Sequence, residues 1–139
     1  MNPMTHIKLC GFADEADANR SGQIKALTEN AIPYLEIRGV DGTNIADLSR
    51  EDALRFKSEL DAAGIKVWSI GSPAGKTQIS GAFEKDIATF KHLLDMAEIF
   101  EAKRIRLFSF YGTNGEESYF DEVCRRLNIF CDLCDERVF

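Results

Sequence analysis

Four short apolar segments, each followed by a segment with helical periodicity, constrain the fold of this chain more than any other feature. The apolar segments begin near positions 6, 33, 66 and 104, so about 30 residues separate one from the next. This spacing is typical of parallel strands joined by helices, because neighbouring parallel strands need a connection of a dozen or more residues. The sequence therefore predicts an α/β fold with a parallel sheet, built as a single domain from residues 1–139.

Local signals give the bounds of these elements. Ser49-Arg50-Glu51-Asp52 has the form of a capping box and Gly64 that of a C-terminal cap, so a helix is expected between them. We expect strands at His6–Phe12, at Pro33–Arg38, from Lys66 onward and at Arg104–Phe110, and helices at Arg20–Asn30, Ser49–Gly64, Phe83–Glu101 and Glu116–Glu136.

The composition narrows the classes of partner and location. The chain has 139 residues, with 17 Lys and Arg against 23 Asp and Glu, a formal net charge of −6 and no run of basic residues. That balance argues against nucleic acid and against an anionic membrane as general partners. No apolar segment approaches the ~20 residues of a membrane span, and the first residues lack a secretory signal pattern. Four cysteines in such a chain predict free thiols and a cytoplasmic location.

A glycine-rich strand end lies at Ile65–Lys76, which reads I-K-V-W-S-I-G-S-P-A-G-K. Its last part is similar to a Walker A phosphate loop, but the spacing is one residue short. A Walker lysine belongs in the first turn of a helix, whereas here Gln78–Gly81 still precede the helix expected from Phe83. We therefore interpret the stretch as a strand-to-loop junction and not as a nucleotide-binding loop.

Four strand-end phrases, taken in order, resemble one family. They lie at Lys8–Glu15 (K-L-C-G-F-A-D-E), Tyr34–Gly42 (Y-L-E-I-R-G-V-D-G), Ile65–Lys76 and Ile105–Tyr111 (I-R-L-F-S-F-Y). They are similar to the sugar phosphate isomerase/epimerase family, the xylose-isomerase-like TIM barrels that also include endonuclease IV. A TIM barrel has eight βα units in about 250 residues, and this chain has half of that. The resemblance implies an α/β fold that is the parallel (β/α)4 half of a TIM barrel, truncated before strand five.

The resemblance also implies a chemistry. In that family a divalent metal (Mn, Mg, Co or Zn) assists the isomerisation or epimerisation of a small sugar or sugar phosphate, while two glutamates move a proton beside a carbonyl. The family's metal ligands come from strands five to eight, so no metal ligand and no catalytic residue is carried over to this chain. We expect the full-length relative to be an enzyme, and this chain alone to bind no metal tightly and to be inactive.

Polar side chains follow each predicted strand, at the edge where βα folds place their functional groups. Glu36 lies in the apolar run Leu35-Glu36-Ile37, where an unpaired carboxylate is costly. It either forms an ion pair with Arg38 or Arg106 or contacts substrate, and Arg38 either pairs with it or clamps an anion. The candidates for substrate contact are Glu36, Arg38, Ser72, Lys76, Ser109 and Tyr111.

Several of these candidates have a structural alternative. Lys76 suits a phosphate or a carbonyl oxygen as a point charge, although a loop lysine is usually solvated. Tyr111 either lines a pocket or caps the end of the sheet. Asp14 and Glu15 either belong to the site or interact with the dipole of the helix that follows them.

The remaining metal-binding residue types do not form a pattern. Cys124, Cys131 and Cys134 fall near one helical stripe, which favours packing in the core over a zinc site. His6 has no partner at a ligand spacing, and His92 is expected on the outer side of its helix.

Two alternative functions stay open beside the preferred one, the first half of a sugar-isomerase-like barrel. One is a non-catalytic half-barrel that assembles with itself through the open edges of its first and fourth strands. The other is a small doubly wound binding domain of flavodoxin or receiver type, which fits the chain length.

Overall fold

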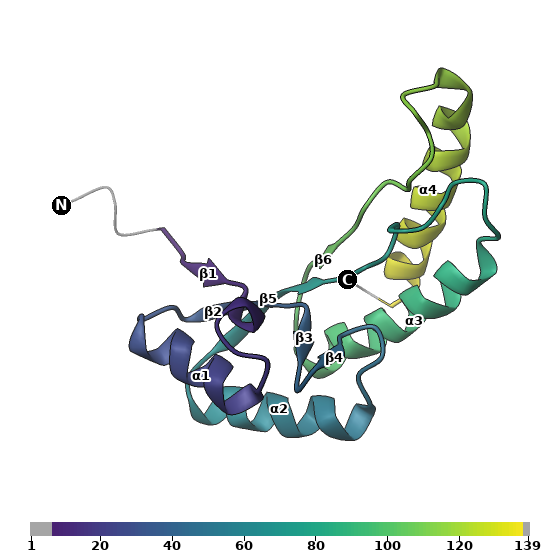
Figure 1. Cartoon of the computed structure of the whole chain (residues 1–139). Coiled ribbons are helices and arrows are strands. Elements are labelled where there is room, and N and C mark those ends of the chain that lie inside the picture. Colours follow the sequence, from purple (N-terminus) through teal and green to yellow (C-terminus); the bar gives the residue numbers. More distant parts are fainter. Residues whose placement is uncertain (1–6, 138–139) are drawn as a thin grey trace.

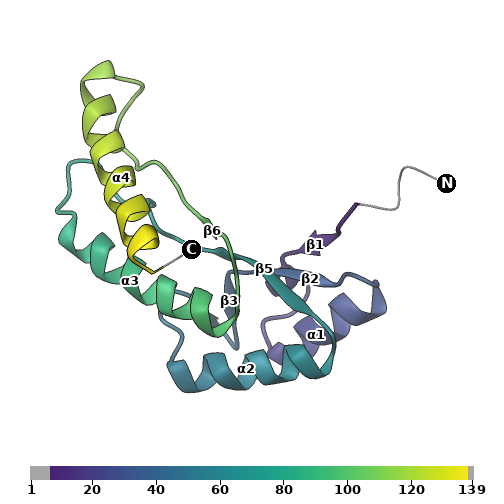
Figure 2. The same ribbon diagram turned by 180° about the vertical axis from the view of Figure 1, so that it is seen from behind.

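The computed structural model describes residues 7–137. In that range four strands form one parallel sheet, and four α-helices lie along one side of it (Figures 1 and 2). None of these helices of residues 7–137 is long and apolar enough to cross a membrane. The elements of the sheet and its helices are β1 (Cys10–Gly11), α1 (Arg20–Glu29), β2 (Tyr34–Ile37), α2 (Arg50–Ala62), β5 (Lys66–Gly71), α3 (Glu84–Ile99), β6 (Ile105–Arg106) and α4 (Phe120–Glu136), with 3-10 turns η1 (Ala13–Glu15) and η2 (Glu117–Tyr119).

The order of the strands decides between the predicted architectures. The sheet runs β1-β2-β5-β6, so each helical connection leads to the adjacent strand, and every pairing is parallel. A doubly wound domain reverses its strand order at a switch point, whereas a barrel adds its strands in one direction. The prediction of a half barrel is therefore confirmed, and the doubly wound alternative is wrong.

Helix α2 begins and ends where its local sequence predicts. The Asp52 backbone N–H donates a hydrogen bond to Ser49 Oγ at 3.1 Å, which confirms Ser49 as the N-cap. In place of the second bond of a capping box, the Ser49 hydroxyl donates to Asp52 Oδ2 at 2.7 Å. Gly64 has a φ of 72°, the left-handed conformation that ends a helix without a steric penalty for glycine. Because this cap turns the chain sharply, β5 starts two residues later, at Lys66.

The core lies between the sheet and the helices. Phe90 of α3 and Phe130 of α4 are almost fully buried, and their ring centroids are 4.4 Å apart. Phe56 of α2 meets Phe100, just after α3, edge to face at 6.2 Å. Burial of aromatic side chains of this size is a large favourable term in folding, so these pairs join α2, α3 and α4 into one layer.

The prediction of a fourth strand at Arg104–Phe110 is wrong for the second half of that range. Only Ile105–Arg106 pairs with β5. Beyond these residues the chain forms hydrogen bonds with the loop that follows β5, and the Phe108 N–H donates to the Ala74 carbonyl at 2.9 Å. This tertiary contact has no local sequence signal, since an apolar run looks the same whether it pairs with a strand or with a loop.

Two other elements begin later than predicted. The expected strand His6–Phe12 is reduced to the two residues of β1, and His6 itself lies outside the described residues. The helix expected from Glu116 begins as the 3-10 turn η2, and α4 starts at Phe120. Helix starts of this kind often pass through a 3-10 turn, so the difference concerns the boundary and not the element.

A β-hairpin that was not predicted follows β2. Its strands β3 (Gly39–Val40) and β4 (Thr43–Asn44) pair antiparallel. The turn between them has φ values of 53° at Asp41 and 75° at Gly42, as in a type I′ turn. Asp-Gly is a favoured sequence for that turn, so the signal for the hairpin was present in the chain.

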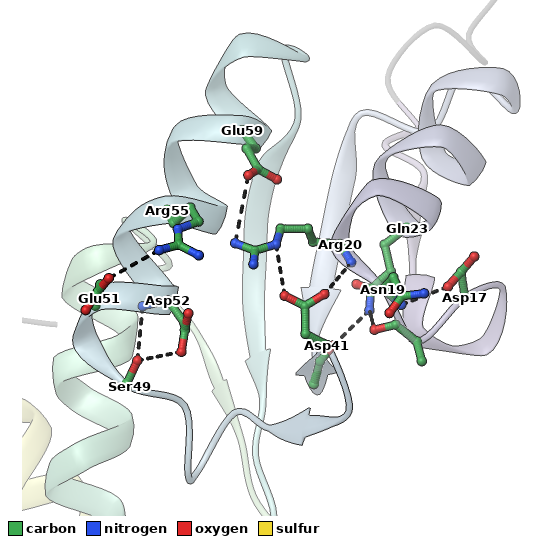
Figure 3. A network of polar contacts seen from close by, with 12 residues as sticks. Asp17, Asn19, Arg20, Gln23, Asp41, Ser49, Glu51, Asp52, Arg55 and Glu59 are labelled. Carbon is green, nitrogen blue, oxygen red and sulfur yellow. Dashed lines mark hydrogen bonds and ion pairs between the residues drawn. The ribbon is translucent and has the colours of Figure 1, made fainter.

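Asp41 also ties this hairpin to the helices (Figure 3). Its carboxylate accepts a hydrogen bond from the Arg20 backbone N–H at 3.0 Å and forms an ion pair with Arg20 Nε at 2.9 Å. Arg20 Nη1 in turn lies 3.8 Å from Glu59 of α2. These contacts hold the segment that leaves the carboxyl end of β2, where Arg38 stands.

Cys131 and His92 differ from their expected environments. Cys134 packs against the edge of the core and Cys124 is half-buried, but Cys131 is exposed, and all are free thiols. The expectation of core packing is therefore wrong for Cys131, because α4 turns that side toward solvent. His92 is half-buried with its Nε2 atom enclosed, and not on the outer side of α3.

Candidate functional site

The sheet has one face that the helices do not cover. Leu35 and Ile37 of β2 are each 1% exposed, because they point into the helical layer. Tyr34 and Glu36 alternate with them and are half-buried, so they point to the opposite face. In the described part of the chain all four α-helices gather on the first side (Figures 1 and 2), which leaves Glu36 on an open surface.

Glu36 and Arg106 form an ion pair across this open face. Glu36 Oε1 lies 2.8 Å from Arg106 Nε, which joins β2 to β6 over the strand between them, β5. Gly71 of β5 lies directly beneath. A Cβ atom there would come within 3.2 Å of Glu36 Oε1, 3.1 Å of Arg106 Nη2 and 2.7 Å of Arg38 Cγ. The absence of a side chain at Gly71 therefore lets these polar side chains lie flat on the sheet. We call Glu36, Arg38, Gly71 and Arg106 the rim cluster.

Arg38 is held by two carboxylates from the turn after β1. Its Nε donates to both oxygens of Asp14 at 3.1 Å, and its Nη2 lies 2.9 Å from Glu15 Oε1. The guanidinium also stacks over the Phe12 ring at 4.4 Å. These hydrogen bonds, above all those that Arg38 donates to Asp14, raise the pKa of Arg38. Asp14 and Glu15 thus hold the Arg38 guanidinium in place. Glu36 pairs with Arg106 rather than with Arg38.

Arg106 keeps part of its guanidinium free. Its Nε is used by Glu36, while within residues 7–137 no acceptor is hydrogen bonded to its two Nη groups. The guanidinium lies 4.8 Å from the centroid of the Phe108 ring. Lys76 Nζ lies 4.6 Å from the same centroid. Phe108 therefore brings the predicted Lys76 next to the rim cluster, and two cations meet at one aromatic ring.

The other candidates do not join the rim cluster. Ser72 is 1% exposed, and its hydroxyl donates to the Arg106 carbonyl at 2.5 Å and accepts from the Ala74 N–H at 3.2 Å. The expectation that Ser72 stands on the rim is wrong, because this hydroxyl fixes the loop after β5 from within. Ser109 is exposed and borders a different hollow, formed with the segment before α4. Tyr111 is 51% exposed and bonds to the loop after β5 through its backbone.

The cysteine nearest to this site is a poor nucleophile. Burial, and then the negative charge of Glu36, raise the pKa of the Cys10 thiol. A thiol of this kind stays protonated at neutral pH, and the thiolate is the reactive form. The chemistry of the site is thus that of its guanidinium and ammonium groups, which bind anions and polarise carbonyl oxygens.

The donor groups of the rim cluster do not suit a divalent metal. In residues 7–137 there is no group of three or more His, Cys, Asp or Glu side chains placed to hold an ion. The carboxylates nearest to the site, Asp14, Glu15 and Glu36, all accept hydrogen bonds from arginine. A cation would compete with guanidinium groups for each of them, so these residues do not fit a resident metal.

Arg106 and Gly71 are the members of the cluster that the sequence did not mark as site residues. An arginine in the apolar run I-R-L-F is as unusual as the glutamate in Leu35-Glu36-Ile37, and that signal was present. Gly71 has no such signal, because its role depends on side chains from two neighbouring strands.

Comparison with known proteins supports the fold. No family model and no curated protein sequence matches the chain. The structure is similar to the crystal structure of the probable 3-DHS dehydratase AsbF, involved in petrobactin synthesis, from Bacillus anthracis, with a TM-score of 0.73 and 20% identity. The match covers 94% of this chain and 49% of that chain, so the present chain spans about half of the solved one. At this identity the likeness concerns the fold alone, and it confirms an α/β fold that matches half of a TIM barrel.

Proposed function

We propose that this chain is the first half of a barrel enzyme that isomerises or epimerises a small sugar or sugar phosphate, and that Arg106 binds an anionic or carbonyl oxygen of the substrate. The observation that carries the proposal is the free part of the Arg106 guanidinium. Glu36 Oε1 accepts a hydrogen bond from Arg106 Nε at 2.8 Å and so holds the guanidinium on the uncovered face of the sheet, at the carboxyl ends of the strands. TIM-barrel enzymes place their active sites at that end.

The fold supports this class of reaction. The solved protein, half of whose chain matches this fold, is named as a probable dehydratase. Dehydration of a β-hydroxy carbonyl compound and isomerisation of a sugar both begin with removal of a proton from the carbon beside a carbonyl group. Both therefore need positive charge next to the oxygen on which negative charge develops. Arg106 and Lys76 supply such charge, since both lie against the Phe108 ring.

The residues of the rim cluster have different roles in this proposal. Arg106 touches the substrate, and a planar guanidinium suits a phosphate or carboxylate because it donates two parallel hydrogen bonds. Glu36 is a positioning residue, since it holds Arg106 through Nε and leaves both Nη groups without a hydrogen-bond partner among residues 7–137. Arg38 is held by Asp14 and Glu15 and shapes the edge of the site. The base that removes the proton lies outside the rim cluster.

Substitution of Arg106 tests the proposal by direct binding. We expect the chain to bind ribose 5-phosphate, and Arg106→Met to weaken that binding about tenfold or more, because a hydrogen bond to a charged group contributes about 1.5–3 kcal/mol. Calorimetry or NMR titration at low salt gives the dissociation constant. Unphosphorylated ribose in the same titration separates recognition of the phosphate from recognition of the sugar.

The matched control is Arg55→Met. Arg55 is an exposed arginine of α2 that pairs only with Glu51 in the described part of the chain, and α2 lies on the covered side of the sheet. Arg55→Met should leave the affinity unchanged. An Arg106→Met variant that is folded, as judged by circular dichroism, and that binds as tightly as the unchanged chain would contradict the proposed role.

A second candidate function is self-assembly through the edges of the sheet. The edge strand β1 is preceded by Ile7 and Leu9, which are 67% and 55% exposed. Two copies related by a two-fold axis along the barrel would place β6 of each beside β1 of the other and keep every strand parallel. We propose a dimer of this kind as the alternative to a catalytic half. Light scattering over a range of concentrations should then show a dimer that Leu9→Lys weakens, and a stable monomer would rule it out.

A further inference from the structure

Cations gather at the opposite ends of the strands from the rim cluster. Lys66 is the first residue of β5, Arg104 directly precedes β6, and Lys8 lies two residues before β1. Lys103 adjoins Arg104. All four side chains are exposed. We call Lys8, Lys66, Lys103 and Arg104 the amino-end cluster, because neighbouring parallel strands bring their amino ends to the same edge of the sheet.

Aromatic rings hold two members of this cluster in place. The Arg104 guanidinium carbon lies 3.8 Å from the centroid of the Trp68 ring, and Lys8 Nζ lies 5.2 Å from the same ring. Lys8 Nζ is also 5.7 Å from the ring of Tyr34, which packs edge to face on Trp68 at 5.3 Å. Cation–π contacts of this kind restrict the two charges to one region, so less side-chain entropy is lost when they meet a ligand.

Carboxylates do not balance these charges. Within residues 7–137 no ion pair involves a member of the amino-end cluster, although the chain as a whole has a net charge of −6. Two carboxylates, Asp61 and Glu101, lie beside this cluster. Both of them bind Lys57 Nζ, at 2.6 and 2.8 Å. Like charges placed together without a counter-charge repel one another, and a bound anion removes that cost.

A hollow of about 300 Å³ lies at this place. Lys66, Trp68, Lys103 and Arg104 line it, together with Lys57 and its two carboxylates. It is therefore a concave surface with a net positive lining, four cations against two carboxylates, at the junction of β5, the end of α3 and the start of β6. That combination has the size and the charge of a site for a small anion.

We propose that the amino-end cluster binds a compact polyanion, namely the phosphate groups of a phosphorylated small molecule, at the end of the half barrel opposite to the rim cluster. A polyphosphate carries several charges within a few ångströms, as the cluster does. A nucleic acid does not fit, because the net charge of −6 repels an extended polyanion and the site is too small for one. Because Arg106 takes no part, this inference is independent of the proposed enzymatic role.

Trp68 supplies the readout, since it is the single tryptophan of the chain. Titration with inorganic pyrophosphate at low salt should change the Trp68 fluorescence in a saturable way, with a dissociation constant on the order of 0.1 mM. Inorganic phosphate should bind more weakly, and added salt should weaken both. Calorimetry on the same samples measures the binding without relying on fluorescence.

Two exposed lysines allow a test that spares the fold. The double variant Lys66→Gln and Lys103→Gln should raise the dissociation constant for pyrophosphate about tenfold, because two charges are removed from the hollow. The matched control is Lys91→Gln, an exposed lysine of α3 that does not line the hollow. It should bind pyrophosphate as the unchanged chain does.

Three results would overturn the inference. The first is no saturable binding of pyrophosphate by either method, and the second is equal affinity in the double variant. The third is tighter binding of a poly-glutamate peptide than of pyrophosphate, which would assign the cluster to an acidic polypeptide. Loss of pyrophosphate binding in Arg106→Met, with the double variant unaffected, would move the anion to the rim cluster and so also contradict the inference.

Discussion

Gly75→Ala is expected to destabilise the protein by about 3 kcal/mol. Gly75 has a φ of 82°, and a Cβ atom placed on it would lie 1.8 Å from the Phe108 carbonyl oxygen. The obstacle is backbone and not a flexible side chain. It is also held in place, because the Phe110 N–H donates to the Gly75 carbonyl at 2.9 Å. An alanine therefore has to separate the loop after β5 from the segment after β6.

The control for this substitution is Gly64→Ala. Gly64 has a similar φ of 72°, but no atom lies within 4 Å of the position of its Cβ. Its replacement costs only the left-handed backbone conformation, about 1 kcal/mol. Chemical unfolding followed by circular dichroism measures both variants. If Gly75→Ala loses no more stability than Gly64→Ala, the close contact with Phe108 is not a determinant of stability.

Arg126→Met is expected to lose about 2 kcal/mol. The Arg126 side chain is 6% exposed, and its Nη2 donates to the carbonyls of Ile79 and Gly81 at 2.8 and 2.9 Å. Ile79 is buried, so methionine leaves its carbonyl without a donor. The loss is limited by one gain: Arg126 Nη1 is buried without a partner, and its desolvation cost disappears.

The neighbouring arginine provides the control for this second substitution. Arg125 and Arg126 both bind the Glu122 carboxylate at 2.7 Å. Arg125, however, is 55% exposed and contacts no backbone carbonyl of the described residues. Arg125→Met should leave the stability almost unchanged, as is usual for an exposed ion pair. Both arginines lower the pKa of Glu122 to about 2, with Arg125 the larger cause. Equal losses in the two variants would contradict the role assigned to the buried arginine.

The two substitutions act on one functional feature. Arg126 donates hydrogen bonds to the carbonyls of Ile79 and Gly81, and Gly75 allows the Phe108 backbone to approach closely. Both residues therefore fix the long loop between β5 and α3. That loop carries Lys76, whose ammonium group lies over Phe108 beside Arg106. We therefore expect Gly75→Ala and Arg126→Met to weaken the binding of ribose 5-phosphate as well as to destabilise the chain.

Features that depend on neighbours in the chain were predicted from the sequence. The N-cap at Ser49 and the cap at Gly64 involve residues a few positions apart, and both are present. The Asp41-Gly42 turn is equally local and its sequence signal is present, although the hairpin was not predicted. The ion pair of Glu36 was expected as well, because a carboxylate in an apolar strand needs a partner wherever the strand lies.

Features that depend on distant segments were left open or were not predicted. Glu36 was expected to pair with Arg38 or with Arg106, because nothing local distinguishes Arg106, which is 70 positions away, from Arg38. The buried position of Ser72 follows from the carbonyl of Arg106, which is 34 positions away. The shortness of β6 likewise follows from the approach of the loop after β5.

The sequence by itself determined the alternation of strands and helices, and with it the parallel sheet of a half barrel, because crossover spacing and hydrophobic period are properties of the chain. Only the tertiary structure decided which cations meet at each end of the strands. Arg106 stands over Gly71 at the carboxyl ends, and Arg104 over Trp68 at the amino ends. The physical reason is the register of the sheet, which brings side chains from separate strands into contact and which no local pattern specifies.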